Sequence, residues 1–215
     1  MEEYTPHTHR LEVVDAYIRD LFRDELPESI QYHDSEHTLH PTKGVVAVAN
    51  RLALEEGVSD RDRELVVTAA YFHDAGFIRE YVKNEPIAAR MAGRILRLIG
   101  YDPGEIRTVQ SLILATNPQV PPRSHLEEIL CDADLDNLGR EDFFELDEKL
   151  RLGELSKGAG AEDEATWRRR TIRFMKEHRY YTPSQKKRRN AGKERNLMML
   201  RASDQAEPGT SRPRT

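Results

Sequence analysis

The stretch Ala69-Ala70-Tyr71-Phe72-His73-Asp74-Ala75-Gly76-Phe77 decides how the chain is organised. It ends an apolar run over residues 65–72 that is too apolar for a surface helix, so it predicts the core helix of a bundle. The run is followed by adjacent imidazole and carboxylate side chains, His73 and Asp74. Buried ionisable groups are costly unless they are paired or bind a metal ion. We therefore expect this pair to have partners elsewhere in the chain.

The rest of the chain also has the pattern of an all-α protein. Its 215 residues are enough for one well-packed domain, or for a domain plus an appendage, and 33 % charged residues suit helices with charged outer faces. Apolar residues at helical spacing predict helices over residues 8–25, 36–57, 86–100, 140–155, 162–178 and about 183–201. Further helices are expected after the capping residues Ser59, Asp102 and Ser124. No segment shows the alternation of a β-strand.

Composition excludes several functional classes. The net charge of −5 gives no support for bulk electrostatic binding to nucleic acid or to an acidic membrane. A single cysteine, Cys131, excludes an intramolecular disulfide and fits a reducing compartment. No apolar run is long enough to span a bilayer, and the acidic N-terminus lacks the pattern of a signal peptide. We expect a cytoplasmic protein that binds neither membranes nor nucleic acid.

Two other stretches supply candidate partners for His73 and Asp74. His33 and His37 lie four residues apart in Tyr32-His33-Asp34-Ser35-Glu36-His37-Thr38, and acidic residues alternate along Leu130-Cys131-Asp132-Ala133-Asp134-Leu135-Asp136. Together, the side chains of His37, His73, Asp74 and Asp134 would offer two imidazoles and two carboxylates. Such donors favour manganese, iron, cobalt, nickel or zinc over calcium, with magnesium also possible. Each piece alone also fits an ordinary core histidine or a capping acid.

In this order, the pieces resemble the HD superfamily of metal-dependent phosphohydrolases, an all-helical fold. The resemblance covers roughly residues 30–140 and includes Asn84-Glu85-Pro86-Ile87-Ala88-Ala89 and Ile113-Leu114-Ala115-Thr116. It implies metal ligands at His37, His73, Asp74 and Asp134. Position 134 is preferred to 132 because cyclic-nucleotide phosphodiesterases, which use a similar site, place a ligand in a matching Ala-Asp-Leu. Those enzymes also carry a proton-donating histidine four residues before the first ligand, which corresponds to His33.

One departure from the superfamily pattern concerns the number of metal ions. Two-metal members add two histidines between the His-Asp pair and the last aspartate. Between Ala75 and Cys131 this chain has only His125, beyond a proline-rich loop, and Glu85 and Thr116 occupy the expected places. We therefore expect one divalent metal ion, with Glu85 as a hydrogen-bond partner for water.

The resemblance implies hydrolysis of a phosphomonoester or phosphodiester bond in a nucleotide or another small phosphorylated metabolite. His33, Asp74 and Glu85 are the expected catalytic residues, and Arg79 and Lys83 the expected substrate-binding residues. Two alternatives are oxygen chemistry at the same metal, which the missing histidines disfavour, and a non-catalytic nucleotide-binding or sensor module. The oligomeric state stays open.

The predicted domains are an HD-type domain over residues 1–160, a basic helical extension over 161–201 packed on it, and a disordered tail over 202–215. From Arg168 to Arg195 there are twelve Lys or Arg against two Glu. Such a stretch can bind nucleic acid or a polyphosphate. It also suits an amphipathic helical pair that docks its apolar face (Ile172, Phe174, Met175, Leu197, Met198 and Leu200) on the domain. We favour docking.

Overall fold

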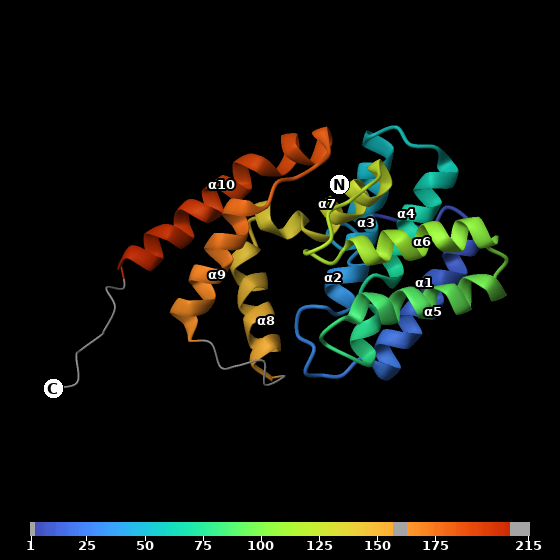
Figure 1. The fold of residues 1–215 in the computed structure, drawn as a ribbon, viewed down its shortest axis with the longest axis horizontal. Coiled ribbons are helices and arrows are strands. Elements are labelled where there is room, and N and C mark those ends of the chain that lie inside the picture. The colour runs from blue at the N-terminus through green and yellow to red at the C-terminus, as the bar shows by residue number, and fades with distance from the viewer. Residues whose placement is uncertain (1–2, 157–162, 207–215) are drawn as a thin grey trace.

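The computed structural model describes residues 3–156 and 163–206, and within these ranges all regular structure is helical (Figure 1). The α-helices are α1 (His9–Glu25), α2 (Ser35–Leu39), α3 (Val45–Glu55), α4 (Asp60–Phe72), α5 (Asn84–Leu98), α6 (Pro103–Ala115), α7 (His125–Asp134), α8 (Phe143–Ser156), α9 (Glu164–Glu177) and α10 (Pro183–Ala206). Two short 3₁₀ helices, η1 (Ala75–Ile78) and η2 (Asp136–Gly139), follow α4 and α7. The all-α prediction is confirmed. No helix in the described ranges is both long and apolar enough to cross a bilayer.

Helix α4 is the central element of the main hydrophobic core. Its residues from Glu64 to Phe72 are all buried, and it packs against α1, α3, α6 and α7. A helix buried on every side must be apolar on every side, as the sequence predicted. The caps are also as expected, since Ser59, Asp102 and Ser124 each accept a hydrogen bond from a backbone amide in the first turn of α4, α6 and α7. The end of α4 is thereby fixed deep in the bundle.

The prediction of a single helix over residues 36–57 is wrong, because the structure has two helices there. Helix α2 ends at Leu39, and a turn through Pro41 separates it from α3. Proline disfavours the helical conformation in the residue before it, here His40. A Cβ atom at Gly44 would lie 2.6 Å from the backbone nitrogen of His40, so the turn also needs glycine. The break makes α2 a separate short helix that carries His37.

Helices α8, α9 and α10 form a second layer with its own small core (Figure 1). This core contains Leu138 and Phe143 in addition to Ile172, Met175 and Leu200 from the proposed docking face, whereas Met198 is 66 % exposed. The layer therefore starts near residue 138, before the boundary predicted at 160, which itself lies outside the described residues.

The C-terminal helix is longer than predicted. Helix α10 continues to Ala206 rather than ending at Arg201, and residues 207–215 of the predicted tail lie outside the described residues. The extra turn follows from the residues themselves, because Ala202 to Ala206 contains neither proline nor glycine.

Polar contacts join α10 to the segment around η2. Asp132 accepts hydrogen bonds from the backbone nitrogen and hydroxyl of Thr182, and Arg189 forms a bidentate pair with Asp136 at 2.7 and 2.8 Å. The backbones also approach closely, because a Cβ at Gly192 would lie 2.1 Å from the carbonyl oxygen of Gly139. The basic extension is thus integrated with the residues that follow α7.

His178 makes the stability of this layer sensitive to pH. Its Nδ1 atom lies 3.0 Å from the Lys193 ammonium, and burial together with the Lys193 and Arg179 cations lowers its pKa to about 3. The folded state keeps His178 neutral, whereas the unfolded chain binds a proton below about pH 6.5. Stability is therefore present above pH 6.5 and is lost as the pH falls. This group should lower the free energy of unfolding by about 2 kcal/mol between pH 7 and pH 5.

Urea unfolding at the two pH values tests this expectation. His178→Gln keeps a hydrogen-bond acceptor for Lys193 but cannot titrate, so its unfolding free energy should lose about 2 kcal/mol less than that of the parent protein on acidification. His9→Gln, at a side chain 87 % exposed, is the matched control and should behave like the parent. An equal pH dependence in His178→Gln and the parent would contradict the assignment.

Candidate metal centre

His73 stands at the C-terminal end of α4 and is 1 % exposed. Its Nδ1 atom lies 2.7 Å from the carbonyl oxygen of Ala70, so Nδ1 carries a proton and donates it to that oxygen. This bond fixes the orientation of the ring and directs Nε2 towards α2 and α7. A histidine held in this way is typical of a metal ligand whose other nitrogen is anchored by the backbone.

His37 reaches the same point from α2. Asp34 caps this helix by accepting a hydrogen bond from the backbone nitrogen of His37, and the buried ring of Tyr32 packs against the His37 ring at a centroid distance of 4.6 Å. The Nε2 atoms of His37 and His73 are 3.4 Å apart. The two imidazoles therefore meet although they come from different helices.

Two carboxylates complete the cluster. Asp74 Oδ2 lies 3.2 Å from Nε2 of His73 and 3.5 Å from Nε2 of His37. Asp134 Oδ1, at the end of α7, lies 3.5 Å and 3.1 Å from the same two atoms. The structure thus brings together the four residues that the sequence proposed as ligands.

The separations between the donor atoms fit one metal ion. Two ligand atoms each about 2.1 Å from a shared ion stand about 3.0 Å apart at a right angle and about 3.4 Å apart at the tetrahedral angle. The five separations in this cluster run from 3.1 to 3.5 Å. Calcium prefers oxygen ligands, so the two imidazole nitrogens disfavour it. The donor set therefore suits a small transition-metal ion.

The electrostatics of the cluster concentrate negative charge at this point. Burial opposes ionisation of Asp74, but His73 and His33 lower its pKa well below its ordinary value. Burial likewise opposes ionisation of Asp134, and hydrogen bonds from His37 and His73 lower its pKa to about 2. Both carboxylates are ionised at neutral pH. Burial opposes protonation of His73, but the Asp74 charge and the hydrogen bond to Asp134 raise its pKa well above the ordinary value. The two carboxylates therefore stabilise positive charge at this point.

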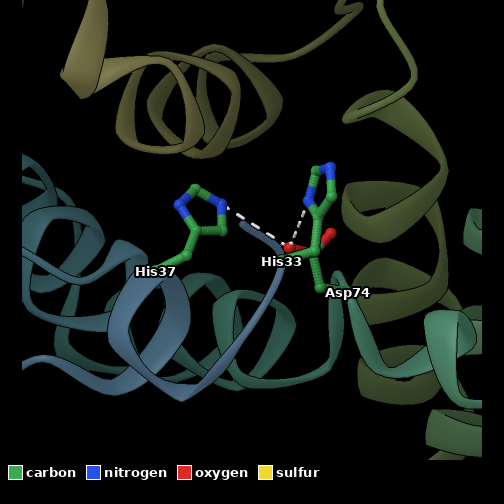
Figure 2. Close-up of side chains that lie close together, drawn as sticks. All are labelled: His33, His37 and Asp74. Atoms are coloured by element: carbon green, nitrogen blue, oxygen red, sulfur yellow. Dashed lines mark hydrogen bonds and ion pairs between the residues drawn. The ribbon is translucent and has the colours of Figure 1, made fainter. Parts of the chain in front are cut away.

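His33 lies beside the cluster. Its Nδ1 atom is 2.9 Å from Asp74 Oδ2, and its ring stacks on Phe77 with a centroid distance of 4.1 Å and an interplanar angle of 17°. Figure 2 shows the rings of His33 and His37 approaching the same carboxylate of Asp74 from two sides. In the described ranges, two sets of side chains could hold a metal ion: His33, His37 and Asp74, or His37, His73 and Asp134. Both contain His37, so they belong to one centre.

A cavity of about 390 Å³ opens next to this centre. His33, Asp74 and Asp134 form part of its wall, together with Glu85 at the start of α5 and Thr116 at the end of α6. The Glu85 carboxylate is buried, and its Oε2 atom has no hydrogen-bond partner within the described ranges. Glu85 is held there by close packing, since a Cβ at Gly76 would lie 2.0 Å from the Asn84 carbonyl oxygen.

Arg79 and Lys83, the expected substrate-binding residues, do not line this cavity. The Arg79 side chain is 67 % exposed and pairs with Glu25 at 3.2 Å. Lys83 is exposed and adopts a left-handed conformation with φ of 62° before α5. Nearness in sequence to His73 did not bring these side chains to the cavity, and their role in substrate binding stays a prediction.

Sequence reasoning missed the cationic residue that does reach the cavity, Arg170 on α9. It also missed Trp167 and Phe174, which line the cavity from the same helix. A helical spacing of three and four residues places these three side chains on one face of α9, which was the available signal. Nothing in the sequence indicated that this face meets the metal centre.

The neighbouring acids have structural roles. Asp132 accepts hydrogen bonds from the backbone nitrogens of Tyr181 and Thr182, and Asp136 pairs with Arg189. Of the three alternating acids, only Asp134 contacts the histidines. Position 134 rather than 132 faces the metal centre.

Comparison with known proteins adds one finding. Residues 38–136 match the family model of the HD domain, while no curated protein and no solved structure matches the chain. The matched segment contains His73, Asp74 and Asp134 and begins one residue after His37. The matched segment spans helices α3 to α7 and three of the four residues of the cluster. Residues 38–136 are therefore similar to an HD domain, which is consistent with a protein of the HD superfamily.

Proposed function

We propose that this protein is a metal-dependent phosphohydrolase that cleaves a phosphomonoester or phosphodiester bond in a nucleotide or another small phosphorylated metabolite. The observation that carries the proposal is a cluster of two imidazole nitrogens, 3.4 Å apart, that each lie 3.1 to 3.5 Å from the same two carboxylate oxygens, beside a cavity. HD domains are generally those of metal-dependent hydrolases. A module that only bound a nucleotide would not need this donor set.

His37, His73, Asp74 and Asp134 are the residues that would hold one divalent ion of manganese, iron, cobalt, nickel or zinc. When bound, such an ion supplies Lewis-acid polarisation of the phosphoryl group and activates water as the nucleophile. The protein contributes fixed positions: Ala70 anchors His73, and Asp34 anchors the start of the helix that carries His37. Fixed ligands keep the donor atoms together without a cost in side-chain ordering at each turnover.

His33 and Glu85 are placed to handle protons. Asp74 occupies Nδ1 of His33, so Nε2 is the nitrogen available to give a proton to the departing oxygen of the substrate. Glu85 Oε2, buried and without a partner in the described ranges, can accept a hydrogen bond from the attacking water. The two groups line one cavity, as a general acid and a water-positioning group must.

Metal analysis of the purified protein, followed by a phosphate-release assay, tests the proposal. We expect about one transition-metal ion per chain, and release of phosphate from a panel of small phosphate esters that stops with a chelator and returns with manganese. Metal-free protein that still binds a nucleotide would instead support the sensor alternative. Absence of phosphate release from every ester tested with metal-loaded protein would contradict the proposal.

A further inference from the structure

The cavity beside the metal centre has a second wall that lies outside the HD domain. One wall is the metal centre itself, and the opposite wall comes from α8 and α9. The match to the HD family ends at residue 136, whereas Leu150, Trp167, Arg170 and Phe174 all follow it. In Figure 1 these two helices lie side by side next to the bundle. Side chains of the C-terminal layer can therefore contact a ligand in the cavity directly.

Flat apolar side chains dominate this wall. Trp167 and Phe174 contribute rings from α9, and Phe77 and Tyr81 contribute rings from the other side. The Trp167 ring is fixed, because its Nε1 atom donates a hydrogen bond to Asp147 at 3.1 Å and the Arg170 guanidinium lies 4.4 Å from its centroid. Aromatic rings in the wall of a cavity favour a flat, largely apolar ligand.

Three polar atoms in the cavity lack partners. The side-chain oxygens Asn84 Oδ1, Glu85 Oε2 and Asn137 Oδ1 are buried without a hydrogen bond within the described ranges, and all three residues line the cavity. Asn84 and Glu85 are each 8 % exposed. Buried acceptors without donors are unfavourable, so a ligand that offers hydroxyl or amino groups would be preferred to a purely apolar one.

The charges of the lining limit the number of phosphates. Among the described residues of the cavity wall, Arg170 alone is Lys or Arg, and it already pairs with Glu154. The carboxylates that line the cavity are Asp74, Glu85, Asp134, Asp147 and Glu154. Two of these carboxylates would neutralise a divalent ion, so little positive charge remains for phosphate, and a single phosphate group is favoured over the three of a triphosphate.

From this combination we propose that α8 and α9 select the organic part of the substrate. The substrate class is the ester of a single phosphate with a flat, largely apolar group that carries hydroxyl or amino donors. Trp167 and Phe174 contact the flat group, Asn84 and Asn137 accept its hydrogen bonds, and the phosphate faces the metal centre. This inference rests on the proposed phosphohydrolase function for the orientation of the substrate, but not for the binding preference.

Tryptophan fluorescence tests the binding preference without turnover. Trp167 is the single tryptophan of the chain and lies in the wall, so its emission reports on the cavity. Titration with phenyl phosphate and with AMP should change the emission and reach saturation. Glucose 6-phosphate and ATP should bind at least about tenfold more weakly. Equal responses to all four compounds would overturn the proposal.

Kinetics of a wall variant test the same preference with turnover. Phe174→Ala should raise KM for phenyl phosphate and AMP by about tenfold and reduce their advantage over glucose 6-phosphate. Phe144→Ala is the matched control, because Phe144 packs on the core of the same layer but does not line the cavity, and it should leave the preference unchanged. Equal shifts in the two variants would show a structural effect and overturn the role of Phe174.

Two further readouts keep the test decisive. If Phe174→Ala does not fold, Phe174→Leu retains apolar volume without the flat ring and should shift KM in the same direction. If metal-loaded protein releases phosphate from no ester, the proposed function fails while the fluorescence titrations still decide the binding preference. Selective saturation by phenyl phosphate and AMP would then support the inference, and unselective binding would overturn it.

Discussion

Asp74→Asn is expected to remove both the bound metal ion and the phosphate-releasing activity. The Oδ2 atom of Asp74 lies 2.9 Å from His33, 3.2 Å from His73 and 3.5 Å from His37, so three imidazoles depend on one carboxylate oxygen. An amide has the same shape but lacks the charge, and its NH₂ group is not a metal ligand. We expect metal content near background and kcat/KM lower by a factor of at least about 10³.

Elemental analysis and phosphate release measure the two expected losses. Asp20→Asn is the matched control, because this aspartate is 63 % exposed and forms a surface ion pair with Arg23. It should retain both metal and activity. Circular dichroism should show that Asp74→Asn remains helical, since the core around α4 is unchanged. Full activity in the folded Asp74→Asn protein would refute the assignment of the centre.

Local signals in the sequence predicted most of the helices. Ser59, Asp102 and Ser124 cap α4, α6 and α7 as expected, because a capping side chain acts on amides two or three residues away. The division between α2 and α3 was missed although Pro41 was visible. The apolar periodicity on both sides of the proline concealed a turn of five residues. Local sequence signals therefore predict where a helix starts better than they predict whether a helix is interrupted.

The sequence predicted only those residues of the candidate site that belong to a recognisable motif. His37, His73, Asp74 and Asp134 were proposed from their order in the chain, and the structure brings them together. Arg79 and Lys83 were proposed only from their nearness in sequence to His73, and the structure places both away from the cavity. The wall that includes Trp167 and Arg170 follows from how α9 packs, which no local pattern encodes. Tertiary packing across more than 90 residues decided that part of the site.

His33→Gln is expected to lower kcat in a manner that depends on the leaving group. Glutamine can still donate a hydrogen bond to Asp74 from its amide, but it cannot deliver a proton to a departing oxygen. For esters of alkyl alcohols, whose oxygen must be protonated as it leaves, kcat should fall by about 10²–10⁴. For p-nitrophenyl phosphate, whose leaving group is stable as an anion, kcat should fall by less than about tenfold.

The metal content of His33→Gln distinguishes two possible roles of His33, proton donor and metal ligand. His33 belongs to one of the two sets of side chains that could hold a metal ion, so loss of the ion in this variant would assign it to the ligands instead. A proton donor requires unchanged metal content together with the leaving-group dependence. His125→Gln is the matched control, since this histidine is 44 % exposed and pairs with Glu128, and it should alter neither. Asp74 contacts His33 as well as His37 and His73, so it would couple a proton donor at His33 to the metal centre. Metal content and the leaving-group dependence of kcat together decide whether His33 is a proton donor or a metal ligand.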